Sequence, residues 1–225
     1  AHPDWKGKSA NGPYGDVVEE LDGRIGDLLK VLADEELEKN TIVVFMSDNG
    51  TEPGQRKWGS GEPFRGLKWS AMEGGTRVPC ILRFPNVIPA REVTDKLTTA
   101  IDLLPTLAGA CGIKLKKGSG IAPKLDGLNL WESLQGKTKI HPRKSLLYWH
   151  GWAMPQAIRV GDFKLYLDKV KEIPATNKGP VLIDLSKDPG EEKDLASEHP
   201  EKVKELKELA IKLLSEIEEN SISLG

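Results

Sequence analysis

Two oxygen-bearing side chains, Asp48 and Asn49, come one residue after a short apolar run at residues 41–46. The run is continuous and rich in β-branched residues, which is typical of a strand covered on both faces. Side chains that leave the carboxyl end of such a strand converge in a crevice of an open α/β sheet. A carboxylate beside an amide carbonyl supplies the hard oxygen ligands of Ca²⁺ or Mg²⁺. Asp-Asn-Gly is also ordinary turn chemistry, and the tripeptide alone favours the turn.

A second candidate, Lys68, lies in a segment rich in glycine, proline and charge, residues 50–79. A connection of that length inside a compact domain is usually functional or disordered. Glu73-Gly74-Gly75 predicts a tight turn after the lysine. The glycines place Lys68 near a candidate anion site, although its spacing alone favours a solvated surface lysine.

Histidine and tryptophan occur together in the second half of the chain. His150 has Trp149 beside it and Trp152 two residues later. His150 could contact a substrate, and the two indoles could stack on a sugar or aryl ring. Packing at a junction between two sheets explains the same three residues at least as well.

These residues need elements to position them, and the first half predicts an α/β sheet. Apolar positions at helical spacing predict a surface helix within residues 16–40. Strands are expected at residues 41–46 and 80–85. Asp102 is expected to cap a helix through Ala110.

The second half predicts a smaller antiparallel sheet covered by a terminal helix. A basic, weakly periodic stretch at residues 114–143 places a boundary between domains 1–113 and 114–225. Three strand segments follow, at residues 144–150, 156–167 and 180–185, with a turn signal at Gly161-Asp162. A stripe of apolar residues predicts a helix over residues 200–220.

Composition excludes several classes of protein. The 225 residues carry a formal net charge of −2, which gives no general attraction to nucleic acid or to an anionic membrane. No apolar run approaches the roughly 20 residues of a membrane-spanning helix. Cys80 and Cys111 lack metal-site spacing and are expected to be small buried hydrophobes.

The order of the motifs resembles the carboxyl-terminal half of a type I sulfatase, the formylglycine-dependent arylsulfatase family. The motifs are TIVVFMSDNG, RGLKWSAMEGGTRVP, DLLPTLAGACG, RVGDFKLYL and LIDLSKDPGEEKDLA, and the resemblance covers nearly the whole chain. It implies an alkaline-phosphatase-like mixed sheet flanked by helices, followed by the smaller antiparallel sheet. It also implies a sulfate ester substrate of aryl or sugar type and a periplasmic or secreted location.

The resemblance also assigns roles to individual residues. Asp48 and Asn49 match metal ligands, usually for Ca²⁺, and Lys68 matches a sulfate-binding lysine. Glu73 and its neighbours match a segment with an architectural role. The family has a catalytic histidine in a His-x-Pro setting, whereas His2 is directly followed by Pro3. Either His2 is that histidine after a deletion, or the true one precedes residue 1, which the spacing favours.

The family's nucleophile is absent from these 225 residues. It is a formylglycine made from a cysteine in a Cys-x-Pro-Ser-x-Arg context, which neither cysteine here matches. The paired aspartates that complete the family's metal shell are absent as well. The expectation is a sulfatase fragment that is inactive without the amino-terminal half. The alternatives are a noncatalytic module that binds sulfated glycans, and a phosphodiesterase or phosphonate hydrolase of the same superfamily.

Overall fold

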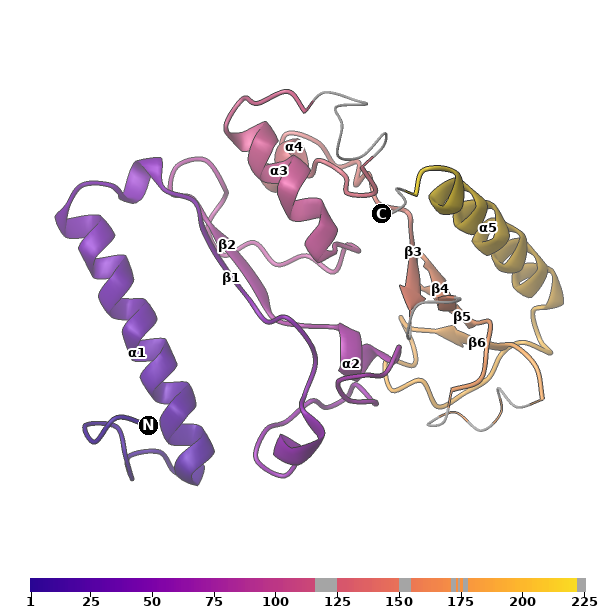
Figure 1. Ribbon diagram of the computed structural model, residues 1–225, viewed down its shortest axis with the longest axis horizontal. Coiled ribbons are helices and arrows are strands. Elements are labelled where there is room, and N and C mark those ends of the chain that lie inside the picture. The colour runs from indigo at the N-terminus through magenta and orange to yellow at the C-terminus, as the bar shows by residue number, and fades with distance from the viewer. Residues whose placement is uncertain (116–124, 150–154, 171–172, 174, 176–177, 222–225) are drawn as a thin grey trace.

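The computed structural model describes residues 1–115, 125–149, 155–170, 173, 175 and 178–221 (Figure 1). The long helices α1 and α5 lie at opposite ends of the molecule, with two sheets between them (Figure 1). In chain order the elements are α1 (Gly12–Asp34), η1 (Glu38–Asn40), β1 (Val43–Met46), η2 (Pro53–Gln55), α2 (Glu73–Thr76), β2 (Cys80–Arg83), η3 (Ala100–Asp102), α3 (Leu103–Ala110), α4 (Trp131–Leu134), β3 (Ser145–Trp149), β4 (Pro155–Val160), β5 (Phe163–Tyr166), β6 (Val181–Asp184) and α5 (Pro200–Glu219).

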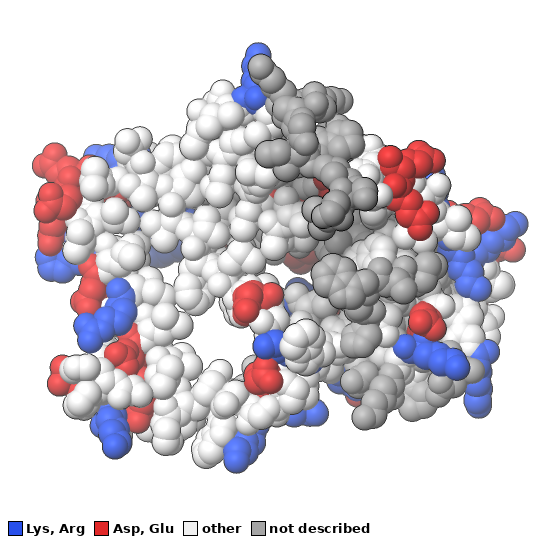
Figure 2. Space-filling model, in the orientation of Figure 1, with Lys and Arg blue, Asp and Glu red and all other residues white. Residues whose placement is uncertain are grey.

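Helix α1 is amphipathic, but its apolar side is largely uncovered in the described part of the chain. The helix begins earlier than predicted because Pro13 stands in its first turn, where a fixed φ suits the helix. It ends at Asp34, just before Glu36 adopts a φ of 58°. About half of the surface of its apolar residues is exposed, and these residues are Val17, Val18, Leu21, Leu28 and Val31. Figure 2 shows an opening between α1 and the rest of the molecule.

The first sheet consists, in the described residues, of β1 and β2 paired antiparallel from Val43 with Arg83 to Met46 with Cys80. All four residues of β1 are only partly buried, so the prediction of a strand covered on both faces is wrong for this structure. The prediction that both cysteines are buried is also wrong. Cys80 is exposed because β2 is half uncovered, and Cys111 is exposed just after the last turn of α3.

The second sheet is an antiparallel meander in the order β3-β4-β5-β6. It has four described strands where the sequence indicated three segments, because residues 156–167 form a hairpin. The hairpin turns at Gly161, whose φ of 59° suits glycine, and pairs Val160 with Phe163. The predicted antiparallel sheet and terminal helix are confirmed.

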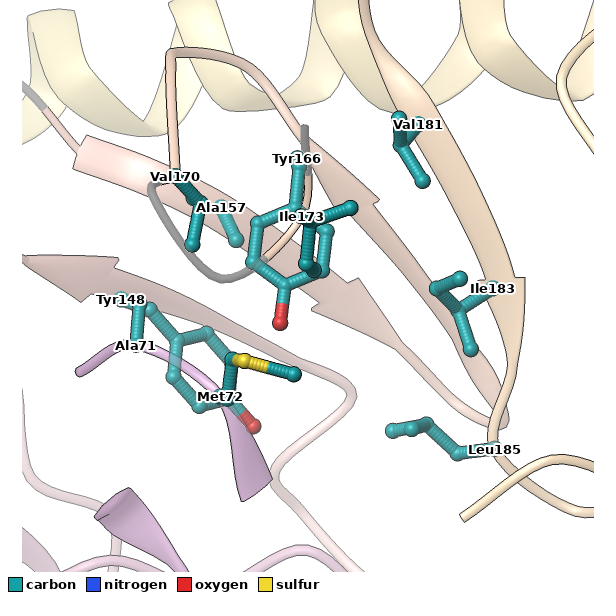
Figure 3. Close-up of a cluster of buried hydrophobic side chains, with 10 residues drawn as sticks. All are labelled: Ala71, Met72, Tyr148, Ala157, Tyr166, Val170, Ile173, Val181, Ile183 and Leu185. Atoms are coloured by element: carbon teal, nitrogen blue, oxygen red, sulfur yellow. The ribbon is translucent and has the colours of Figure 1, made fainter. Parts of the chain in front are cut away.

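Each face of this sheet has its own core. One face packs against Leu206 and Ala210 of α5. The other face receives Ala71 and Met72, which precede α2, and Figure 3 shows Met72 beside Tyr148. The core of the second sheet therefore includes residues from the first half of the chain. The boundary predicted between residues 113 and 114 stays a prediction.

A buried ion cluster lies on the face of the sheet that meets α2. Lys164 is fully buried, and its Nζ lies 2.9 Å from Glu73 Oε1 and 3.0 Å from Glu191 Oε1. The same Nζ donates a hydrogen bond to the Ala71 carbonyl at 2.7 Å. The Glu73 amide donates to Glu191 Oε2 at 2.8 Å. Because paired and hydrogen-bonded charges are the form in which ions are tolerated in a core, this cluster fixes α2 against the sheet.

A second buried pair joins the helical region to β3. Arg143 donates two hydrogen bonds to the Asp102 carboxylate, at 2.9 Å from Nε and 2.5 Å from Nη2. Asp102 is the N-cap residue of α3, as predicted, but its side chain makes no capping hydrogen bond to that helix. Its carboxylate instead completes a capping box with Thr99, the N-cap residue of η3.

The ion cluster makes a clear prediction for stability. Lys164→Met leaves Glu73 and Glu191 buried without their cation, so we expect the free energy of unfolding to fall by about 3–5 kcal/mol in urea denaturation. Lys193→Met is the control, because its ion pair with Glu198 is exposed and contributes less than about 1 kcal/mol. Equal losses in the two variants would contradict the structural role of the cluster.

A second prediction concerns the segment before α1. Amide hydrogen bonds from Gly7 and Ser9 hold the pKa of the Asp16 carboxyl below its ordinary value. A lowered folded-state pKa means that this stabilisation is fully present above about pH 4 and is lost as the pH falls through the folded-state pKa. The NMR shifts of the two amides should therefore titrate with a midpoint below about 4. Asp16→Asn should abolish that titration and Asp22→Asn should leave it, whereas a midpoint at or above the ordinary value would refute the assignment.

Candidate functional site

The end of β1 is held by backbone contacts with the segment around α2. The Ser47 amide donates to the Pro79 carbonyl at 3.2 Å, and the Gly50 amide donates to the Gly75 carbonyl at 3.0 Å. A Cβ on Gly50 would lie 2.0 Å from the Gly74 carbonyl oxygen, so only glycine allows this approach. The positions of Asp48 and Asn49, between these two contacts, are thereby fixed.

Asp48 and Asn49 line one cavity of about 560 Å³. Asp48 is exposed and Asn49 partly buried, and neither side chain has a hydrogen bond or ion pair within the described residues. One carboxylate and one amide are suitable donors for a hard cation, which takes six to eight oxygen ligands. The described residues contain no group of three or more His, Cys, Asp or Glu side chains that could hold a metal ion. The pair therefore fits part of a Ca²⁺ or Mg²⁺ coordination shell.

The cavity also brings together parts of both sheets. Trp149, at the end of β3, lines it and is 40% exposed. Arg77 and Arg159 line it from α2 and β4, and both form ion pairs with Glu73, at 3.9 and 3.4 Å. The wall of the cavity is thus continuous with the buried ion cluster.

Lys68 lies on a neighbouring segment, outside the residues that line this cavity. Its amide donates to the Thr51 carbonyl at 2.9 Å, and Thr51 is three residues after Asp48, a span of at most about 11 Å. The Lys68 side chain is 30% exposed, and its Nζ lies 3.0 Å from Glu52 Oε2. The structure therefore places the Lys68 segment beside the end of β1, with the ammonium held by Glu52.

Two glycines after Glu73 shape the turn that carries Lys68. A Cβ on Gly74 would lie 2.5 Å from the Arg65 carbonyl oxygen, and one on Gly75 would lie 2.4 Å from that of Leu67. Glu73 itself is buried in the ion cluster, which agrees with its predicted architectural role.

Of the two histidines predicted for the site, the structure describes His2. His2 is exposed beside α1, where its backbone amide donates to Glu20 Oε2 at 2.7 Å, and it does not line the cavity. His150 and Trp152 lie outside the described residues. The roles predicted for His2 and His150 stay predictions.

The sequence did not predict one residue that contacts Lys68. Glu52 is a charged residue in a loop, and nothing in its spacing indicates a partner sixteen residues later. Its role depends on the pairing of Thr51 with Lys68, which is a tertiary contact.

Two family models match the chain. One, described as "Sulfatase", covers residues 3–113, and the other, described as "N-sulphoglucosamine sulphohydrolase, C-terminal", covers residues 68–220.

Curated relatives and solved structures agree with these models. The chain is 33% identical to human arylsulfatase A over 91% of its length, and 33% identical to an N-acetylgalactosamine-6-O-sulfatase of Bacteroides thetaiotaomicron over 92%. It spans 44% and 43% of the lengths of these two relatives. A sulfatase structure from a study of glycosaminoglycan metabolism by the same bacterium superposes with a TM-score of 0.80 at 30% identity, over 94% of this chain and 46% of that one.

The fold and these matches together define an α/β domain of the alkaline-phosphatase-like type, as the sequence predicted. The chain belongs to the sulfatase family. No helix in the described residues has both the length and the apolar character needed to cross a membrane.

The ion pair of Lys68 makes a prediction about anion binding. Glu52→Gln removes a carboxylate that competes for the ammonium, so we expect the affinity for inorganic sulfate, measured by calorimetry, to rise about 2- to 5-fold. Glu38→Gln is the control, because it removes a partly exposed ion pair between Glu38 on η1 and Arg83 on β2. An unchanged affinity in Glu52→Gln would show that the Lys68 ammonium does not meet the anion.

Proposed function

We propose that this chain supplies the metal-binding and sulfate-binding residues for the hydrolysis of aryl or carbohydrate sulfate esters. The observation that supports it most is the backbone pairing of Thr51 with Lys68 and of Gly50 with Gly75. This pairing brings the backbone of Lys68 beside the end of the strand that carries Asp48 and Asn49. A sulfate bound at the end of β1 would contact a metal ion on one side and the Lys68 ammonium on the other.

Each residue has a defined task in this proposal. Asp48 and Asn49 would hold a divalent cation, Ca²⁺ or Mg²⁺, which when bound polarises the sulfate oxygens. Lys68 would leave Glu52 for the sulfate and stabilise the negative charge that develops on the bridging oxygen. The glycine turn and the ion cluster hold the lysine segment in place, which limits the reorganisation needed during reaction.

The metal ligands and the nucleophile are completed, in this proposal, by the amino-terminal half of a sulfatase domain. Two features support such a partner: the exposed apolar side of α1 and the partly buried β1. The relatives are more than twice as long as the region they share with this chain. The chain alone is then expected to be inactive, and a formylglycine would lie in the partner segment. A periplasmic or secreted location fits this proposal.

Turnover tests the proposal directly. The 225-residue chain with Ca²⁺ should not hydrolyse 4-nitrophenyl sulfate, whereas the protein that includes the amino-terminal half should. In that longer protein, Lys68→Ala should lower kcat/KM by about 10²–10³-fold, the usual effect of losing a charge-stabilising donor. Lys57→Ala, which removes a lysine that lies 5.0 Å from the Trp58 ring, is the matched control.

Three results would contradict the proposal. Turnover by the 225-residue chain that depends on Lys68 would refute the need for a partner. Faster hydrolysis of 4-nitrophenyl phosphate than of the sulfate in the longer protein would assign it to phosphate esters. Binding of sulfated sugars without hydrolysis in the longer protein would make it a binding module.

A further inference from the structure

We propose that Trp69 is a stacking platform for the ring to which the substrate's sulfate is esterified. The inference rests on the proposed function, because the position of the ring is argued from a sulfate group bound beside Lys68. It adds to the proposed function the residue that would contact the ring of the aryl or carbohydrate ester.

Trp69 occupies a backbone position that disfavours its side chain. The Ser70 amide donates to the Leu67 carbonyl at 3.0 Å, which closes a turn with Lys68 and Trp69 at its tip. Trp69 has a φ of 76°, the value of the third residue of a type II turn, where glycine is the favoured residue. A bulky residue with positive φ is a true outlier, and such strain concentrates at ligand-binding sites.

Packing in the described chain does not explain the indole. Trp69 is 74% exposed, against 47% for Trp58 and 40% for Trp149. Burial therefore offsets little of the backbone strain. An exposed indole alone would need no explanation, but one held at a positive φ on a closed turn beside Lys68 is a candidate ring-binding surface.

The indole lies beside the charge that the proposed function assigns to sulfate. Lys68 Nζ is 5.2 Å from the centre of the Trp69 ring. A sulfate ester on that ammonium would carry its ring carbons toward the indole, whose surface is mostly open. Rings stack on tryptophan through apolar contact and through weakly positive C–H groups over the π face. Lys68 would thus bind the sulfate group of the ester, and Trp69 would stack on its ring.

Binding measurements on the 225-residue chain test this assignment. The ligands are N-acetylgalactosamine 6-sulfate, inorganic sulfate and unsulfated N-acetylgalactosamine, titrated by NMR at a fixed Ca²⁺ concentration. Trp69→Gly suits the turn and should raise Tm, so loss of folding does not obscure the result. We expect it to weaken binding of the sugar sulfate about 2- to 12-fold and to leave inorganic sulfate unchanged. Trp69→Phe should restore most of the affinity, and Trp58→Ala should have no effect.

The outcomes separate this inference from the proposed function. Unchanged sugar sulfate binding in Trp69→Gly, equal weakening of inorganic sulfate, or no binding of the sugar sulfate by the unaltered chain would overturn the role of Trp69. If Lys68→Ala leaves sulfate binding intact while Trp69→Gly still weakens binding of the unsulfated sugar, the ring platform stands and the anion site fails. If Lys68→Ala abolishes sulfate binding and Trp69→Gly changes nothing, only the anion site stands.

Discussion

A single buried ammonium, that of Lys164, organises the structure around the candidate site. It lies between the carboxylates of Glu73 and Glu191, with two tyrosine rings nearby, 4.3 Å away for Tyr148 and 5.2 Å for Tyr166. Burial and the adjacent carboxylates raise the pKa of both phenols, so they remain neutral hydrogen-bond donors to the two acids. Glu73 is the first residue of α2, and the two glycines that follow it connect the cluster to the site: Gly75 accepts a hydrogen bond from the Gly50 amide, and Gly74 donates one to the Arg65 carbonyl.

Such a cluster is a costly way to join two parts of a chain, because each ion loses its hydration. Hydrophobic residues of similar volume could hold the same surfaces together, but they would fix the orientation of α2 less specifically. A charged triad with backbone donors permits one arrangement in which every group is satisfied. The proposed chemistry needs such an arrangement, because a sulfate bridging a cation and a lysine tolerates little displacement of either.

The sequence predicted much of the fold and only part of the site. The terminal helix and the second sheet followed from apolar periodicity, which packing then confirmed. Asp48 and Asn49 were predicted from their place after a strand, and both line one cavity, while their role as metal ligands stays a prediction. Lys164 was missed because it alternates with Phe163 and Leu165 in β5, a pattern that predicts one core face and one solvent face. In the structure both faces of this strand are covered, so the charge is buried and requires a partner. The Glu52 contact arises from tertiary pairing, which no local pattern encodes. The turn at Trp69 is local, but its third residue is a tryptophan where turn patterns favour glycine, so the sequence gives no sign of it.

The central claim is that the end of β1 and Lys68 act on the same anion. The most direct test is thermodynamic linkage between Ca²⁺ and inorganic sulfate, measured by calorimetry in the protein that includes the amino-terminal half. The account predicts that each ligand raises the affinity for the other by the same factor, about 5-fold or more, and that Asp48→Asn removes this coupling. Two affinities that are independent of each other would contradict it.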